Sequence, residues 1–289
     1  MVRKSRRSRR PRWSSLTAVQ YLLLAVVVVV ADAPLAWLVL TAVKPEAEII
    51  AYPPTILPKS LTTVNFSLLF ATVPIGTYLI NSGVVAFVTM VATVAFGTVA
   101  AYSLARFESL VPHLKSLGQL SLVAYMVPPI LLVVPISQIF VNLGLANSLG
   151  ALVVVYTAIH LPFTLWILRS YFLGISVELE EAAMVDGCTR FGAFLRVVLP
   201  QAVPGIISAG ILTFNGAWQE YLFASVLLIG DPKTWTLSLG QSQLIGPSQP
   251  ITFGVLMAGS ILMTVPVIVL FAVAQRQLVG GLTQGAVKG

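Results

Sequence analysis

The side chains of this chain that could carry out chemistry are few, and they do not form a catalytic set. The sequence has no Gly-Lys dipeptide, so no phosphate-binding P-loop can be drawn, and no Gly-x-Ser-x-Gly motif marks a serine nucleophile. The two histidines, His113 and His160, lie far apart without a partner at metal-ligand spacing, and we expect each in a loop or at a helix end. The sequence therefore predicts a protein that is not an enzyme and that binds no metal or cofactor itself.

One polar cluster could instead contact a solute. It combines two aromatic rings, two amides and a carboxylate: Asn215, Trp218, Gln219, Glu220 and Tyr221. Aromatic rings stack on the apolar faces of sugars, and amides and carboxylates form directed hydrogen bonds with hydroxyl groups. The cluster could therefore line a path for a sugar. The alternative is that it packs between helices.

The elements that must position these residues are membrane-spanning helices. The 289 residues are 57% hydrophobic and only 9% charged, whereas soluble domains carry about 25% charged residues. Three long stretches, 60–105, 116–168 and 234–275, contain no charge at all, and each exceeds the roughly 20 apolar residues that cross a bilayer as a helix. The composition excludes a soluble enzyme, a disordered protein and a nucleic-acid-binding protein, and it predicts an all-α integral membrane protein.

Hydropathy predicts six transmembrane helices, over residues 18–43, 76–105, 117–141, 151–172, 203–228 and 254–275. If the N-terminus is inside, inner segments hold 14 of the 17 cations and outer segments hold Lys44, Lys59 and Lys233. Cytoplasmic loops carry such an excess of cations. We therefore expect a multi-pass plasma-membrane protein with both termini cytoplasmic. Its parts are a basic tail (1–17) near anionic lipid, a transmembrane domain (18–275) and a C-terminal tail (276–289).

Polar residues inside the spans suggest further contacts. Asp32 lies in the middle of the first span, two residues before Pro34. A charge at bilayer depth is costly and usually marks a path or a pair, and both interpretations of Asp32 stay open. Asn81 and Ser82 begin the second span, where we expect them to form hydrogen bonds between helices.

The inner loop 174–203 holds four of the ten acidic residues. Ser176 is a suitable N-cap, and acidic residues follow in the first turns, where the helix dipole favours negative charge. Gly187 interrupts this pattern and can take a left-handed conformation that turns the chain. A second amphipathic run then continues from Phe191 to Pro200. The pattern predicts a helix–turn–helix on the cytoplasmic face, which either receives a partner or lies on the membrane surface.

Within this loop, Glu181-Ala182-Ala183, Gly187 and Val197-x-Leu199-Pro200 resemble the EAA motif of ABC importer permeases, with Val in place of Ile. Other segments resemble signatures of the carbohydrate-uptake, maltose-type permeases: Lys44-Pro-Glu-Ala-Glu48, Asn81-Ser82, Ala101-Tyr-Ser-Leu-Ala-Arg106, Met126-Val-Pro-Pro129, Leu161-Pro-Phe163 and Trp218-Gln-Glu-Tyr221. Residues 281–289 resemble the tail of the G-type subunit. The resemblance covers residues 18–289 and implies a type I ABC importer permease fold with a cytoplasmic coupling helix pair.

The resemblance also implies partners. These are a second permease subunit, a dimeric cytoplasmic ATPase that binds ATP and Mg, and an extracytoplasmic solute-binding protein that delivers a sugar. The residues implied in ATPase coupling are Glu181, Ala182, Ala183, Asp186, Gly187, Arg190, Leu199 and Pro200. Those implied to face the ATPase from the tail are Gly281, Thr283, Gln284 and Lys288, unless the tail is a frayed terminus. The alternative function is a self-sufficient secondary transporter of small polar solutes, although no internal repeat supports it.

Overall fold

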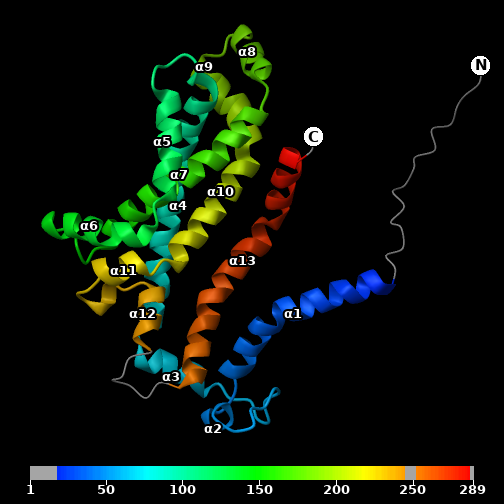
Figure 1. Ribbon diagram of the computed structural model, residues 1–289, viewed down its shortest axis with the longest axis vertical. Coiled ribbons are helices and arrows are strands. Elements are labelled where there is room, and N and C mark those ends of the chain that lie inside the picture. Colours follow the sequence, from blue (N-terminus) through cyan, green and yellow to red (C-terminus); the bar gives the residue numbers. More distant parts are fainter. Residues whose placement is uncertain (1–17, 245–251, 287–289) are drawn as a thin grey trace, which may run out of the picture.

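The computed structural model describes residues 18–244 and 252–286, which form a bundle of helices (Figure 1). Its centre consists of α4 (Ile75–Phe107), α7 (Leu149–Gly174) and α10 (Leu199–Gln219), which contact one another along their lengths. The last helix, α13 (Phe253–Ala286), packs on α10, and α1 (Ala18–Ala42) packs on α13. The bundle thus has two ends, which we call the α8 end, at the top of Figure 1, and the α3 end, at the bottom.

Hydropathy located most spans correctly but did not predict that the third is bent. Helices α1, α4, α7 and α13 and the helical stretch Arg190–Gln219 are long and apolar enough to cross a membrane. The predicted span 117–141 is instead two helices, α5 (Leu114–Met126) and α6 (Pro129–Asn142), bent by 100° to each other. Two consecutive prolines, Pro128 and Pro129, explain the break, because they lack amide hydrogens and force the preceding residue out of the helical region. The fold has six spans only if this bent pair counts as one.

The fifth span is shifted relative to its prediction. A short helix α9 (Arg190–Ala193), a π-helical turn (Phe194–Val198) and α10 form one continuous apolar stretch that ends at Gln219. The prediction that a second inner helix ends at Pro200 is therefore wrong. Pro200 lies in the first turn of α10, directly after the π-helical turn, and the helical stretch continues through it. The span also ends earlier than residue 228, because Glu220 is extended before α11 (Leu222–Leu227).

At the α3 end, the segments predicted as loops contain short helices. These are α2 (Glu46–Ile49), α3 (Val64–Thr72), a 3-10 turn (Pro232–Thr234) and α12 (Leu237–Gln243). Helix α12 packs on α4 and α13. Its close approach requires glycine at position 240, since a Cβ there would lie 2.2 Å from a ring carbon of Tyr78.

Hydrogen bonds from polar side chains, two of them buried, hold the segment between α1 and α3 in a folded conformation. The Lys44 ammonium is buried and donates to the backbone carbonyls of Thr55 and Ile56. Asn65 Nδ2 donates to the carbonyls of Ala42 and Lys44 at 2.8 and 2.9 Å. The hydroxyl of Thr55 donates to Glu48 Oε1 at 2.6 Å, and this bond lowers the pKa of the Glu48 carboxyl below its usual value. The segment is therefore folded back on itself rather than simply extended.

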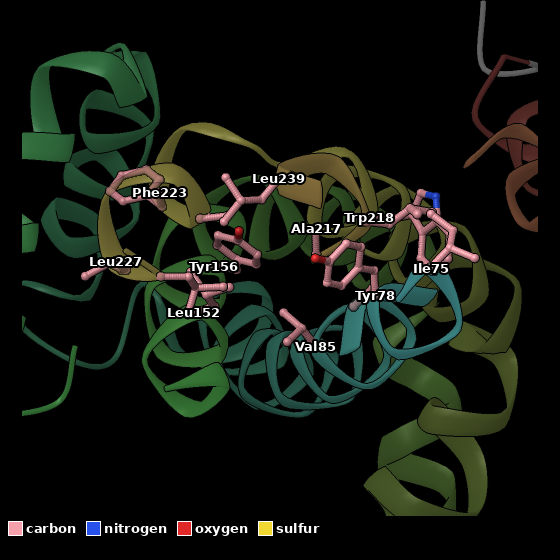
Figure 2. Close-up of a cluster of buried hydrophobic side chains, with 14 of the residues drawn as sticks. Ile75, Tyr78, Val85, Leu152, Tyr156, Ala217, Trp218, Phe223, Leu227 and Leu239 are labelled. Carbon is pink, nitrogen blue, oxygen red and sulfur yellow. The ribbon is translucent and has the colours of Figure 1, made fainter. Parts of the chain in front are cut away.

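The main apolar core lies where α4, α7, α10, α11 and α12 meet. Figure 2 shows side chains from all five helices in contact, among them Tyr78 of α4, Tyr156 of α7, Trp218 of α10, Phe223 of α11 and Leu239 of α12. All five are buried. This core fixes the end of α10, and therefore the polar cluster 215–221, against its neighbours.

The two histidines occupy different settings. His113 is the N-cap residue of α5, so its predicted position at a helix end is confirmed. Its φ is 67°. His160 was expected in a loop or at a helix end and instead lies in the middle of α7, partly buried against Gly216. A Cβ at Gly216 would lie 2.4 Å from the imidazole Cε1, so His160 fills the contact between α7 and α10.

Candidate functional site

The segment with the EAA pattern forms a short helix, α8 (Val177–Val185), that projects beyond the bundle (Figure 1). The Ser176 hydroxyl accepts a hydrogen bond from the Glu178 amide at 3.2 Å, which confirms the predicted N-cap. Gly187 has φ +93°, so the predicted left-handed turn is confirmed as well. No atom lies within 4 Å of the position that a Cβ on Gly187 would take. Glycine is required here for its backbone conformation and not for space.

A buried acid anchors α8 to the bundle. Glu180, which is 4% exposed, accepts a hydrogen bond from the Tyr102 hydroxyl and forms an ion pair with Arg106, Oε2 to Nε at 3.0 Å. Arg106 also donates to the backbone carbonyls of Phe172 and Ile175 at 3.1 and 3.0 Å. One guanidinium thus joins α4, the end of α7 and α8. The low dielectric constant of the protein interior makes the hydrogen bonds and the ion pair of this network stronger than they would be in water.

Sequence reasoning missed this network. It assigned Glu181 to ATPase coupling, for which the exposed position of that side chain is suitable, but it did not single out the neighbouring Glu180, which the structure buries. A signal was present, because Tyr102 and Arg106 are four residues apart and therefore share one face of a helix. That spacing presents a phenol and a guanidinium to a single acidic partner.

The opposite side of α8 and the turn after it are exposed. Glu181, Ala182, Asp186 and Gly187 are all exposed and Ala183 partly so, and Val185 is 87% exposed. Beyond the turn, Phe191 is 70% exposed and the exposed Arg190 places its guanidinium 5.2 Å from the ring centre of Phe107. We call this surface the α8 face. It combines apolar side chains and small residues with two carboxylates, Glu181 and Asp186, and one guanidinium.

Two residues assigned to the same site lie elsewhere. Leu199 and Pro200 are in α10, about 13 Å along the helix from Arg190. Leu199 is partly buried against the core beneath α8, and Pro200 is exposed. The structure therefore brings the first six coupling residues together but not these two. Of the tail residues, Gly281, Thr283 and Gln284 belong to the backbone of α13, which stays helical to Ala286, and Lys288 lies outside the described residues.

A second candidate site is a groove between the end of α10 and α13. Its volume is about 280 Å³, and it is lined by Gln219, Ser260, Met263, Thr264 and Val267. Gln219 is exposed and donates to Asn215 Oδ1 at 2.6 Å. We call this the α10–α13 groove. Ser260 and Thr264, one helical turn apart, were missed by sequence reasoning.

The α10–α13 groove has a wall that is apolar at Met263 and Val267 and polar at Gln219, Ser260 and Thr264. Ser260 Oγ accepts a hydrogen bond from Gln241 Nε2 at 2.7 Å, and Thr264 Oγ1 donates to the Ser260 carbonyl at 2.8 Å. Amide and hydroxyl groups of this kind can both donate and accept hydrogen bonds. The groove can therefore receive a ligand that carries hydroxyl groups.

Three residues of the predicted cluster have other partners. Trp218 is 4% exposed, and its indole N–H donates to the Met263 carbonyl at 3.0 Å, so it packs α10 against α13. Glu220 accepts from the Tyr156 hydroxyl at 2.5 Å and from the amides of Phe223 and Ala224 at 2.9 and 3.3 Å. It therefore caps α11. Tyr221 is 42% exposed beside this break.

The Glu180–Arg106 ion pair leads to a test of stability. We expect Arg106→Ala and Glu180→Ala each to lower the free energy of unfolding by about 3–5 kcal/mol, because each leaves a buried charge without its partner. The double variant should lose clearly less than the sum of the two. Unfolding in mixed detergent micelles measures all three. Glu181→Ala, which removes an exposed carboxylate, is the matched control and should change stability by less than about 0.5 kcal/mol. Strictly additive losses would contradict a coupled pair.

Comparisons with known proteins agree with the architecture. The family described as "Binding-protein-dependent transport system inner membrane component" matches residues 97–283. The chain is 40% identical over 259 residues to "Probable ABC transporter permease protein YurM" of Bacillus subtilis, covering 89% of this chain and 83% of that protein. It is 36% identical over 256 residues to "Sulfoquinovosyl glycerol transport system permease protein SmoH" of Agrobacterium fabrum, covering 89% and 88%.

A solved structure has the same fold. A chain of a bacterial ABC transporter involved in the import of the acidic polysaccharide alginate superposes with a TM-score of 0.76 at 19% identity, covering 90% of this chain and 95% of that one. The resemblance to ABC importer permeases, first seen in the EAA pattern, is thereby confirmed. Because the family match covers more than half of the sequence, this chain belongs to the binding-protein-dependent transport system inner membrane components.

Proposed function

We propose that this chain is the permease subunit of an ATP-driven, binding-protein-dependent sugar importer. It forms half of the translocation path and couples that path to a separate ATPase. The observation that carries this proposal is the α8 face, an exposed surface of apolar and small residues on a helix whose other side is anchored by Glu180. The family favours this function over a self-sufficient secondary transporter. The substrate class rests on the sugar named for the relative from Agrobacterium fabrum.

In this proposal, a dimeric cytoplasmic ATPase binds the α8 face and holds ATP and Mg itself. Small residues such as Ala182 let a partner approach closely, and Glu181 is placed to meet a basic side chain. Displacement of α8 would then pass through Arg106 to α4 and α7, because the guanidinium contacts all three elements. ATP binding and hydrolysis would bias the permease between outward- and inward-open states. The end of α13, which points to the same end of the bundle, would also face the ATPase (Figure 1).

The placement of cations supports the orientation in this proposal. Arg106, Arg169, Arg190 and Arg196 lie toward the α8 end, whereas Lys44, Lys59 and Lys233 belong to segments at the other end. The positive-inside rule then supports a cytoplasmic position for the α8 end in this proposal. The α3 end, with the closed segment 44–63 and helix α12, would face the solute-binding protein.

The sugar path in this proposal uses the α10–α13 groove. Gln219, Ser260 and Thr264 would exchange hydrogen bonds with sugar hydroxyls, with Asn215 holding the Gln219 amide in place. Trp218 and Glu220 would act indirectly, by fixing the end of α10. The second permease subunit would supply the facing half of the path.

The turn at Gly187 gives the sharpest test of coupling. A β-branched residue at positive φ is disfavoured by about 1–2 kcal/mol, so Gly187→Val should reorient α8. Glu181→Lys reverses the charge on the α8 face. We expect both variants to reach the membrane in normal amounts, and to lose sugar uptake and retention of the ATPase on the purified permease pair.

The matched control for this test is Gly144→Val. Gly144 also has a positive φ, +69°, and no atom within 4 Å of its missing Cβ, but it lies outside the α8 face. It should therefore keep uptake and ATPase retention. Wild-type uptake and retention in both Gly187→Val and Glu181→Lys would reduce α8 to a surface helix and remove the main support for the proposal.

Thr264 provides a test of the sugar path. Thr264→Val keeps the shape of the side chain but removes a hydroxyl, and we expect sugar uptake to fall about three- to tenfold through the loss of one hydrogen bond. Gln219→Ala should act in the same direction. Thr72→Val is the control, because the Thr72 hydroxyl makes the same bond to the preceding helical turn but lies outside the groove. Unchanged uptake in both groove variants, at normal expression, would show that the groove does not line the path.

Cys188, the single cysteine, tests the orientation. A membrane-impermeant thiol reagent should label it in permeabilised cells and in inside-out vesicles, because the proposal places it in the cytoplasm. Intact cells should give no labelling. Labelling in intact cells would show that the chain is inserted with the opposite topology.

A further inference from the structure

Helix α1 carries a carboxylate that the fold leaves without a partner. Asp32 is exposed, and within residues 18–244 and 252–286 the structure gives it no hydrogen bond and no ion pair. It lies about 15 Å along the helix from Ala42 and about 21 Å from Ala18, close to the middle of a span. A charge at that depth is strongly unfavourable unless it is paired or in water.

The part of the chain that the structure describes offers Asp32 no hydrogen-bond donor. Helix α1 diverges from the bundle along most of its length and meets α13 toward its C-terminal end (Figure 1). The most apolar 18-residue window of α1 has no buried residue at all. Two residues further on, Pro34 has no N–H to donate to the carbonyl of Val30. The middle of α1 therefore presents acceptors, and whatever meets it must bring a donor.

A second copy of this chain could not supply a cation there. The spans of this sequence contain no Lys or Arg near mid-length, and Arg106, Arg169 and Arg196 lie toward the α8 end. A basic side chain at the depth of Asp32 must come from a different protein. Charge complementarity thus selects a distinct membrane partner and excludes a symmetric pair of α1 helices.

We propose that Asp32 forms a membrane-embedded ion pair with a basic side chain on a transmembrane helix of the second permease subunit. This inference rests on the proposed function, which requires that subunit. The face of α1 that carries Asp32 includes Ala25 and Ala36, and such small residues let two helices approach closely in a membrane. The carboxylate then fixes the depth and rotation at which the two subunits meet.

Photo-cross-linking tests which chain lies against this face. A photoreactive residue is placed at Val29 or Ala36, which share the face of Asp32, or at Val30, which lies on the other side of the helix. In the assembled transporter, positions 29 and 36 should cross-link to the second permease, and position 30 should do so weakly or not at all. Cross-linking of positions 29 and 36 to lipid alone would overturn the proposal.

Substitution of Asp32 then tests the pairing itself. Retention of the second permease on the tagged chain is measured as detergent increases, beside sugar uptake. We expect Asp32→Leu to lower retention about three- to tenfold, because the cation of the partner loses its acceptor. Asp32→Asn should lie between Leu and wild type, and Val30→Leu should be neutral. Full retention in Asp32→Leu overturns the proposal, whether uptake falls, as for a path residue, or stays normal, as for a side chain that faces lipid.

The same experiment separates this inference from the function on which it rests. If the wild-type chain retains an ATPase and a second permease, the importer proposal stands whatever Asp32 does. If the wild-type chain retains no second permease, both proposals fail together, since no such interface exists.

Discussion

The ion pair between Glu180 and Arg106 determines how α8 can act on the rest of the molecule. A helix of nine residues has little stability of its own, and α8 projects beyond the bundle. Its buried carboxylate meets a guanidinium that also contacts the end of α7, so three elements share one charged group. Because the pair is buried on both sides, α8 moves with α4 and α7 or the network breaks. The exposed α8 face can then differ in shape and charge without disturbing that anchor.

The same device holds the other end of the bundle together. There the Glu220 carboxylate satisfies the first amides of α11 and the Tyr156 hydroxyl, while its backbone carbonyl accepts from Ser238 of the α12 segment at 2.6 Å. Helix α4 takes part at both ends, since Asn81 Nδ2 donates to the carbonyls of Lys233 and Trp235 at 2.8 and 2.9 Å. Polar side chains thus join short external segments to the long central helices, and apolar packing fills the space between them.

The sequence predicted the class of fold well because a bilayer imposes a simple length and polarity rule on helices. It was less informative where one side chain decides the geometry. Hydropathy could not register the bend at Pro128 and Pro129, since proline interrupts a helix without changing how apolar it is. Asn81 and Ser82 were expected to bond between helices, and they do so: Asn81 donates to the Lys233 carbonyl in the 3-10 turn and Ser82 accepts from the Leu237 amide of α12, but the sequence did not predict these short helices. Likewise, the motif acid Glu181 and its neighbour Glu180 differ only in which face of α8 they occupy. That difference depends on a helix more than seventy residues away, which local patterns do not reveal.

Glycine is required at two positions of this chain for different physical reasons, and the substitutions accepted at these positions during evolution should reflect the difference. At position 240 the limit is volume, because any Cβ would overlap the ring of Tyr78. No L-residue other than glycine meets that limit unless the tyrosine changes as well, so these two sites should vary together. At position 187 the limit is handedness, because the space is open and only the sign of φ matters. Asn and Asp tolerate that region better than other residues with side chains. Position 187 should therefore accept Asn or Asp as a single substitution, whereas position 240 should change only together with position 78.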